Sequence, residues 1–225
     1  MPSAENTQEA FGVTPVNKVK RMHERGRYDR ETVYAILDAG FICHVGYLID
    51  DQPYVTPTSY WREGDRVYWH GSSASRMLRT VSKGIKVCLT VTHVDGLVLA
   101  RSGFHSSINY RAVMAFGDAE VVVDEAHKRK ALKAFMEHVT PGRWDTLRPV
   151  TSQELKGTTV LSMKLTEVSA KVRTGPPKDD EEDYTLPIWA GVLPLKMVSG
   201  PPEPDPRLTA SVPIPEHAKR FALER

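Results

Sequence analysis

The stretch from Gln52 to Arg79 constrains the fold most, because it encodes a β-hairpin that leads directly into a helix. Residues 53–60 are rich in β-branched and aromatic side chains, which favour a strand. The sequence Arg62-Glu-Gly-Asp65 supplies a turn in which Gly64 can adopt a positive φ, and residues 67–70 return as a second strand. These segments predict an antiparallel hairpin with a helix at its exit.

The corner that follows the hairpin gathers groups that bind anions. Gly71, Ser72 and Ser73 suit a helix N-cap, and apolar residues recur at helical spacing from Met77 onward. Backbone N–H groups, hydroxyls and Arg76 would surround one helix N-terminus, where the orphan donors and the helix dipole favour a phosphate. An ordinary serine-capped helix with a solvated arginine fits the same residues, because most such helix starts bind no ligand. The corner therefore predicts either an anion site or a structural cap.

The composition is that of a globular chain without a strong electrostatic bias. With 225 residues, 40% of them hydrophobic, the chain is long enough for one large domain with a real core. A net charge of +2 gives no global argument for nucleic acid or an anionic membrane. No run approaches the roughly 18–20 apolar residues of a membrane span, and the N-terminus has no apolar signal segment. We therefore expect a cytoplasmic protein with a small-molecule substrate, and no nucleic-acid or membrane partner.

Periodicity and composition divide the chain into a central domain and two arms. Residues 1–17 are polar and aperiodic, which predicts a flexible N-terminal arm. Residues 18–195 alternate about six strand-like runs with helical segments, which predicts an antiparallel, barrel-like α+β domain. Residues 196–225 are rich in proline and predict an extended C-terminal arm that embraces a partner subunit. Helices are expected between residues 29 and 40, from 125 to 138, near 152–156 and near 216–223, and further strands at 41–49, 86–92, 97–101, 111–123 and 158–165.

The sequence lacks the motifs of the common metal, nucleotide and hydrolase sites. The eight histidines include no pair at ligand spacing and no His-Glu-x-x-His, so no metal site is predicted. Gly-x-Gly-x-x-Gly, the P-loop sequence and Gly-x-Ser-x-Gly are absent as well, which argues against Rossmann, P-loop and α/β-hydrolase chemistry. Cys43 and Cys88 lie in apolar strand-like runs and are expected to be reduced thiols.

Several short motifs occur along the chain in the order that is typical of one protein family. The pattern from Val67 to Arg76, preceded by Pro57-Thr-Ser-Tyr60 and followed by Trp189-x-Gly191, resembles the pyridoxamine 5'-phosphate oxidase-like FMN-binding split barrels. Asn109-Tyr-Arg111, before a strand that carries Phe116-Gly117, looks like the branch that includes the nitroimidazole-resistance reductases. The resemblance implies a six-stranded antiparallel split β-barrel with flanking helices in the α+β class. It also implies a homodimer with an FMN site at each subunit interface.

The resemblance also assigns contacts to FMN. Val55 to Tyr60 would lie along the isoalloxazine ring, His70 and Gly71 at the strand end, and Ser75-Arg76 at the phosphate, where a planar guanidinium can bind two oxygens. Asn109 and Arg111 would approach from the next loop, and Trp189 would pack near the flavin. The implied FMN-binding residues are Val55, Thr56, Pro57, Thr58, Ser59, Tyr60, His70, Gly71, Ser72, Ser75, Arg76, Asn109, Arg111 and Trp189.

Two departures from the oxidases argue against oxidation of vitamin B6 phosphates. The oxidases carry a lysine after the Ser-Arg pair, where this chain has Met77. They also place Arg-x-His soon after the tryptophan, where this chain has Leu195, Lys196 and Met197. The chain therefore resembles a flavin-binding relative that acts on a different substrate.

Three functions follow from these features. The first is an FMN-dependent oxidoreductase that passes hydride from a nicotinamide donor to a small substrate, in which the cofactor supplies the chemistry and no conventional catalytic residue is required. The second is a non-catalytic flavin or haem binder or sensor on the same scaffold, with His44 and His93 as the candidate axial ligands. The third is a regulator that contacts DNA through the basic run Lys18 to Arg30, against which the near-neutral net charge counts.

Overall fold

The computed structural model describes residues 9–209 and 211–221. Its helices are α1 (Arg30–Asp38), α2 (Arg76–Val81), α3 (Glu125–Val139), α4 (Ser152–Gly157) and α5 (Glu216–Lys219), with short 3-10 turns at His23–Arg25, Trp144–Thr146 and Glu181–Thr185. Its strands are β1 (Gly26–Arg27), β2 (Ile42–Ile49), β3 (Gln52–Glu63), β4 (Arg66–Ser72), β5 (Lys86–Leu99), β6 (Ser107–Asp118), β7 (Glu120–Val121), β8 (Thr158–Lys164), β9 (Glu167–Arg173) and β10 (Gly191–Pro194).

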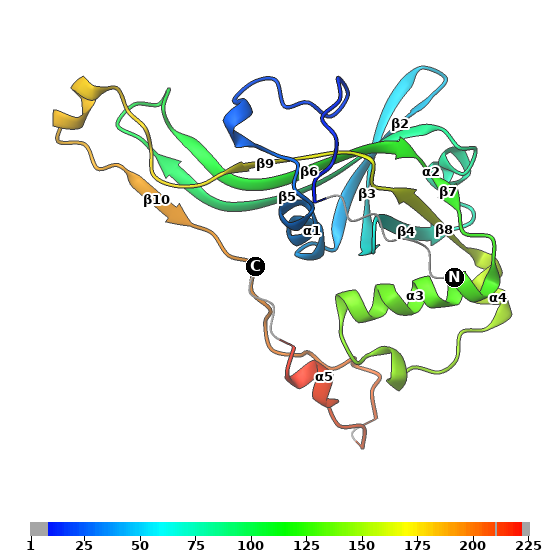
Figure 1. Cartoon of the computed structure of the whole chain (residues 1–225). Helices are drawn as coiled ribbons and strands as arrows, with labels where there is room; N and C mark the ends of the chain where they lie inside the picture. The colour runs from blue at the N-terminus through cyan, green and yellow to red at the C-terminus, as the bar shows by residue number, and fades with distance from the viewer. Residues whose placement is uncertain (1–8, 210, 222–225) are drawn as a thin grey trace.

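The strands form one strongly curved antiparallel sheet (Figure 1). Their order is β1-β9-β6-β5-β2-β3-β4-β8-β7, with β10 paired to β5, so that the described sheet has two free ends and stays open. The predicted 52–79 hairpin is confirmed as β3 and β4, and Gly64 has φ 58° in its turn. Asp50 and Asp51 both have positive φ between β2 and β3, as tight hairpin turns require. The antiparallel α+β class is confirmed.

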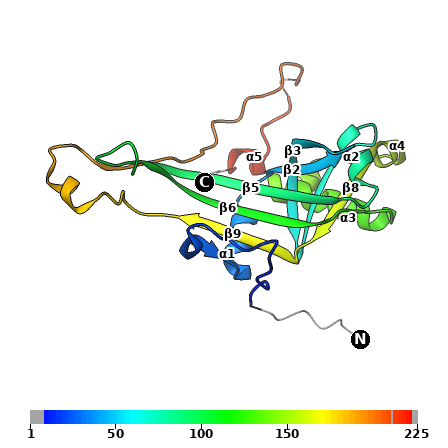
Figure 2. The ribbon, with the colours of Figure 1, turned by 90° about the horizontal axis from the view of Figure 1, so that it is seen from above.

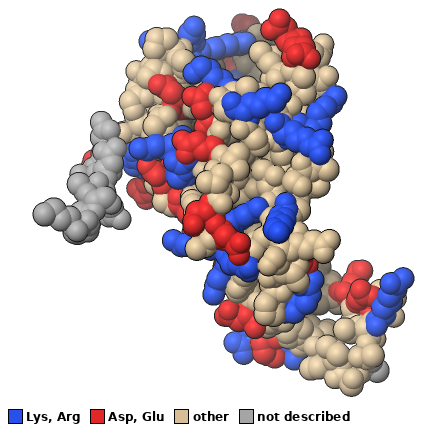
Figure 3. Space-filling view, turned by 90° about the vertical axis from the view of Figure 1, so that its right-hand side faces the viewer, with Lys and Arg blue, Asp and Glu red and all other residues tan. Residues whose placement is uncertain are grey.

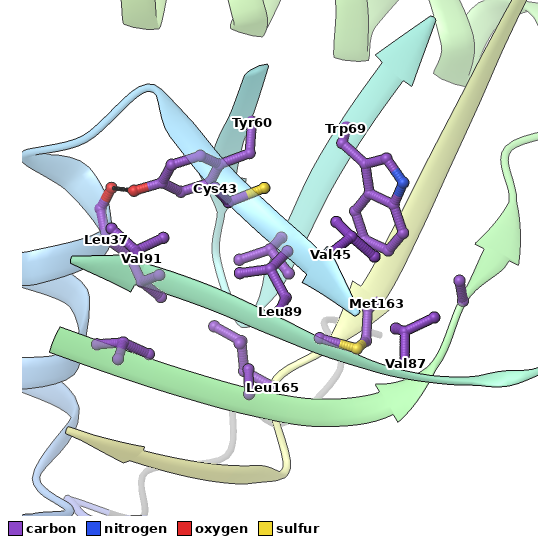
Figure 4. Close-up of a cluster of buried hydrophobic side chains, with 14 of the residues drawn as sticks. Leu37, Cys43, Val45, Tyr60, Trp69, Val87, Leu89, Val91, Met163 and Leu165 are labelled. Atoms are coloured by element: carbon purple, nitrogen blue, oxygen red, sulfur yellow. Dashed lines mark hydrogen bonds between the residues drawn. The ribbon is translucent and has the colours of Figure 1, made fainter. Parts of the chain in front are cut away.

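The main core lies inside the curve of this sheet, and alternating residues of its strands fill it. In β5 the residues Val87, Leu89 and Val91 point inward, while the residues between them are more exposed. Figure 4 shows how side chains from β2, β4 and β8 meet these residues. The hydroxyl of buried Tyr60 donates a hydrogen bond of 2.5 Å to the Leu37 carbonyl, which satisfies an orphan acceptor near the end of α1.

Helix α3 covers a second, smaller core on the outer face of β3 and β4. Trp61 and Tyr68 stack there with ring centroids 5.5 Å apart, and Phe135 of α3 lies 5.3 Å from Trp61. Asp124 caps α3 by accepting a hydrogen bond from the His127 N–H. In α3 only Ala131 is fully buried, and Leu132, Ala134 and Phe135 pack against this core while partly buried.

One predicted break in the sheet is absent. Residues 93–96 resemble a turn in sequence, yet they lie within the continuous strand β5, which pairs with β6 along almost its whole length. A β-bulge between Val94 and Gly96 accommodates the extra residue, Asp95. Gly96 is required because a Cβ there would lie 3.0 Å from the Leu193 carbonyl oxygen of β10. Beyond the bulge the strands extend away from the core as a finger, defined as residues 95–110 and 174–195 (Figures 1 and 2).

Both terminal segments contact the domain. Within the predicted N-terminal arm, Phe11 is buried in the main core and its N–H donates to the Tyr28 carbonyl at 2.8 Å. Within the predicted C-terminal arm, His217 of α5 approaches Gly142 in the loop after α3. The outer limit of the predicted helix near 216–223 falls outside the described residues. None of the described helices is long and apolar enough to cross a membrane.

Candidate functional site

The corner between β4 and α2 has a defined local structure. Ser75, rather than Gly71 to Ser73 as expected, caps α2, because its Oγ accepts a hydrogen bond of 3.5 Å from the Leu78 N–H. The Ser72 carbonyl accepts from the Ser75 N–H at 2.9 Å and closes the turn. A Cβ at Gly71 would lie 3.0 Å from Leu78, so glycine allows β4 and α2 to pack closely. The corner thus presents Ser72 and Ser73 on the surface.

Arg76 is the most available cation at this corner. Its guanidinium carbon lies 4.5 Å from the ring centroid of Tyr54, and no carboxylate lies within ion-pair distance of it in the described chain. Arg79, one helical turn later, donates from Nε to the Ser73 carbonyl at 3.1 Å. The face that carries α2 mixes basic with acidic side chains, so the positive charge here is local (Figure 3). The sequence reasoning missed Arg79, although its spacing from Arg76 was a signal.

The edge of β3 next to this corner is open. Its residues 52–59 pair with β2 on one side, whereas β4 pairs only with residues 60–63. No other described strand occupies the remaining edge. Val55 and Pro57 are exposed on the outer face beside it, while Tyr60 is fully buried and offers a ligand only its main chain. Unpaired main-chain donors and acceptors, an apolar surface and a cation therefore lie side by side.

His70 stands at the end of β4, next to the corner. Its ring packs against Phe135 at 4.6 Å and Trp61 at 5.7 Å between centroids. Burial lowers the pKa of His70, which favours the neutral imidazole. The Nδ1 atom is buried and has no hydrogen-bond partner among the described residues. In a neutral imidazole one ring nitrogen is an acceptor, and a proton on Nε2 would leave no buried N–H unpaired at Nδ1.

A comparison with models of known protein families identifies the family of this chain. Residues 29–172, which include the hairpin, the corner and α3, match the model described as pyridoxamine 5'-phosphate oxidase. The chain belongs to this family. No curated protein matches the chain.

Two solved structures are similar to this chain over most of its length. The structure is similar to flavocytochrome Anf3 from Azotobacter vinelandii, with 51% identity, a TM-score of 0.89, and coverage of 93% of this chain and 98% of that chain. It is also similar to a FAD and heme binding protein from Mycobacterium smegmatis, with 34% identity, a TM-score of 0.85, and coverage of 89% and 98%. A 5-nitroimidazole antibiotic resistance protein from Bacteroides thetaiotaomicron shares the fold, at 23% identity and a TM-score of 0.55 over 64% of this chain and 84% of that one.

This member of the pyridoxamine 5'-phosphate oxidase family also differs in structure at the two positions where its sequence departs from the vitamin B6 phosphate oxidases. Met77, which follows Ser75-Arg76, is 6% exposed and packs in the main core, so this position faces away from the corner. Leu195 to Met197 lie on the surface near the base of the finger. Neither position supplies a second cation at the corner.

Asn109 and Arg111, which were expected to contact the flavin, already have partners in the chain. Arg111 donates to both carboxylate oxygens of Asp95, at 2.8 and 2.9 Å, and this pairing raises the pKa of Arg111. Asn109 is buried, accepts a hydrogen bond from Arg173 and donates one to the Gly175 carbonyl at 3.1 Å. These contacts join β6 to β5 and β9 at the base of the finger, and no described contact joins them to the corner.

Trp189 lies in the finger, just before β10. Its ring covers Gly191, where a Cβ would lie 2.9 Å from the indole. The residue as a whole is 66% exposed. Figures 1 and 2 both place β10 and α2 at opposite ends of the molecule. A single chain therefore does not bring Trp189 to Arg76.

A pocket of about 310 Å³ opens where the end of α1 meets β2 and β5. Most of its lining is apolar, and one lining residue comes from the C-terminal arm. The lining residues are Ala39, Gly40, Phe41, Ile42, Thr92, His93, Val94, Asp95 and Met197. His44 lies beside the pocket on the outer face, opposite Pro57 of β3. The described residues contain no cluster of three or more His, Cys, Asp or Glu that could hold a bare metal ion.

Proposed function

We propose that this protein is a flavin-binding oxidoreductase whose flavin phosphate binds at the corner of Ser72, Ser75 and Arg76. The observation that carries the proposal is a guanidinium without a described carboxylate partner beside an open strand edge. Arg76 can donate two parallel hydrogen bonds to phosphate oxygens. Main-chain groups along Val55 to Ser59 would bind the polar edge of the ring. The family match and the flavin-binding relatives support the same assignment.

We further propose that the flavin is FAD rather than the FMN that the sequence resemblance implied. The terminal phosphate of FMN carries up to about two negative charges, as a phosphate monoester does near neutral pH. Each linked phosphate of FAD carries one. The corner offers Arg76 and the partly engaged Arg79, and Met77 faces the core. The relative from Mycobacterium smegmatis, whose name includes FAD, supports this choice.

The site is completed by a second copy of the chain in this proposal. The outer face of β2, β3, β5, β6 and β10 exposes a set of apolar side chains, which a monomer would leave in water. These residues are Ile42, Leu48, Val55, Val94, Leu97, Ile108, Met114 and Leu193. A homodimer through this face would cover them and would allow the finger of one subunit to bring Trp189 to the corner of the other.

Haem is the second cofactor of the proposed function. The two relatives with the highest identities above are named as a flavocytochrome and as a FAD and heme binding protein. A bound flavin would supply the chemistry that links a two-electron nicotinamide donor to a one-electron acceptor such as haem. The chain supplies binding and orientation: Arg76 fixes the phosphate, the open edge of β3 fixes the ring, and the apolar outer face excludes water once it is covered.

Reconstitution of the full chain tests the flavin assignment. Titration of apoprotein with FAD and with FMN, and mass spectrometry of the flavin released by heat, should show tight binding of FAD. Arg76→Ala should weaken it, whereas Arg62→Ala should not. Arg62 is a matched control because it also lies over a tyrosine, at 4.1 Å from Tyr34, but is paired with Asp38. A protein that binds neither flavin in these titrations contradicts the proposal.

A further inference from the structure

Arg173 carries a buried positive charge that no described carboxylate neutralises. The residue ends β9 at the base of the finger and is only 8% exposed. Its guanidinium donates a hydrogen bond to the side-chain carbonyl of Asn109, which is a neutral acceptor. No Asp or Glu within residues 9–209 and 211–221 forms an ion pair with it. Because buried charges are normally paired or bound to an ion, Arg173 lacks the counter-charge that its burial requires.

Asn109 fixes this guanidinium in position without neutralising it. The amide of Asn109 also donates to the Gly175 carbonyl at 3.1 Å, so both ends of its side chain are engaged. Tyr110 is the direct partner of Arg173 in the antiparallel pair of β6 and β9, which puts these two side chains on one face of the sheet. The positive charge is therefore held in one place before any ligand binds.

Two further cations come close to Arg173. Lys171 lies two positions earlier in β9 and therefore shares its face of the sheet. Gly26 is the partner of Lys171 in the pair of β1 and β9, which brings the preceding residue, Arg25, to the end of β9. Burial, and then the charge of Arg25, lower the pKa of Arg173, so the two guanidinium groups repel each other. Arg25 has a 3.8 Å contact with the exposed Glu24, which contributes little. The cluster therefore gains stability when an anion binds it.

We propose that Arg25, Lys171 and Arg173 form a second phosphate site, which binds the nicotinamide donor of the proposed function through a phosphate monoester. Such a group carries about 1.5–2 negative charges near neutral pH and offers three strong acceptor oxygens, so it matches three cations better than a single carboxylate does. The flavin corner is elsewhere, since β6, β5, β2 and β3 lie between β9 and β4 in the sheet. NADPH carries a phosphate monoester on its adenosine ribose and NADH does not, so the cluster favours NADPH. The identity of the donor rests on the proposed function, whereas the phosphate site itself does not.

Denaturation of the flavin-free full chain, in inorganic phosphate and in chloride of equal ionic strength, tests the site. Phosphate should stabilise the wild type, because a ligand that binds the folded state shifts the equilibrium toward it. Arg25→Ala should be at least as stable as the wild type in chloride, since a repulsive charge is removed, and should lose most of the gain from phosphate. Lys171→Ala should lose this gain as well. Lys133→Ala is the matched control and should keep it, because its ion pair with the exposed Asp145, at 3.5 Å, resembles the Arg25 contact.

The rate of flavin reduction in the flavin-loaded full chain, measured anaerobically against donor concentration, tests the donor. NADPH should reach the half-maximal rate at a lower concentration than NADH. Arg25→Ala should raise that concentration about 10- to 100-fold for NADPH, because a hydrogen bond to a charged group is lost. The value for NADH and the limiting rate should stay at the wild-type level in this variant.

The two measurements separate this inference from the proposed function. A phosphate effect that is absent in the wild type, or unchanged in Arg25→Ala, overturns the site. Stabilisation by phosphate together with equal half-maximal concentrations of NADPH and NADH overturns the donor assignment. A chain that binds no flavin contradicts the proposed function, and denaturation of the flavin-free chain then still decides whether the three cations bind phosphate.

Discussion

The corner at α2 and the finger both carry arginines, but they satisfy them in opposite ways. In the finger and at its base, Arg101 pairs with Asp179, Arg111 with Asp95 and Arg173 with Asn109. At the corner, Arg76 lies on Tyr54 with no described carboxylate partner. The cations of the finger hold distant strands together, whereas the corner keeps its cation available. An arginine that the sequence predicts to bind a ligand can therefore already be paired within the fold, as Arg111 is and Arg76 is not.

The largest effect is expected at the base of the finger. Asn109→Leu should lower the free energy of unfolding by about 2–3 kcal/mol, because it leaves the buried Arg173 guanidinium and the Gly175 carbonyl unsatisfied. Chemical denaturation measures this loss. Asn109→Asp is the control, since its carboxylate can still accept from Arg173. Unchanged stability together with lost flavin affinity would show instead that Asn109 serves the ligand.

Arg76→Ala should have the next largest effect, but on flavin affinity rather than on stability. Flavin affinity should fall about 10- to 100-fold, because a hydrogen bond to a charged group contributes about 1.5–3 kcal/mol. The free energy of unfolding of the apoprotein should fall by no more than about 1 kcal/mol, since the contact with Tyr54 is lost but no described ion pair is. Arg76→Lys should recover only part of the affinity. Its ammonium keeps the positive charge but cannot donate the two parallel hydrogen bonds of a guanidinium. If Arg76→Ala and Arg111→Ala lost flavin affinity equally, the proposed difference between the corner and the finger would be contradicted.

The Asp95–Arg111 pair should give a smaller, purely structural effect. Both side chains are about one-third exposed, so a double-mutant cycle should yield a coupling of at most about 1 kcal/mol. Flavin titrations of Arg111→Ala should match the wild type. Weaker flavin binding in Arg111→Ala, with wild-type flavin binding in Asp95→Ala, would place Arg111 in the site as the sequence predicted.

The smallest expected effect is that of acid on the Arg101–Asp179 contact, which should stabilise the finger down to about pH 4. Burial alone would raise the pKa of Asp179, but hydrogen bonds from the Arg101 N–H and guanidinium lower it below its ordinary value. The stabilisation is therefore fully present above the unfolded pKa of about 3.9 and is lost only as pH falls through the lower folded value. Hydrogen exchange of finger amides between pH 7 and pH 4 should show constant protection after correction for the intrinsic rate. A protection loss above pH 4 would contradict this ordering.

The sequence predicted the parts of the molecule that depend on near neighbours. The hairpin and the helices α1 and α3 each arise from residues a few positions apart, so spacing reveals them. Asp95 and Gly96 misled the prediction because a β-bulge and a turn use the same residue types. The turn interpretation of residues 93–96 was wrong for that reason.

Contacts between distant residues were beyond the reach of sequence patterns. Arg101 meets Asp179, 78 positions later, and Arg173 meets Asn109, 64 positions earlier, through strand register alone. The pocket likewise combines α1, β2, β5 and the C-terminal arm. Phe11 resembles an arm residue in sequence, yet it enters the core because Ala10 pairs with Asp29. Each of these features requires the tertiary fold to be known first.

The most direct test of the composite flavin site mixes two defective chains. Arg76→Ala and Trp189→Ala subunits, each of which should bind flavin weakly alone, are co-expressed with different tags, and the heterodimer is isolated. One of its sites should combine the intact corner of one subunit with the intact finger of the other, so tight flavin binding should return at one site per heterodimer. If the corner and Trp189 act within a single chain, or do not share a site, the heterodimer will bind flavin as weakly as its parents.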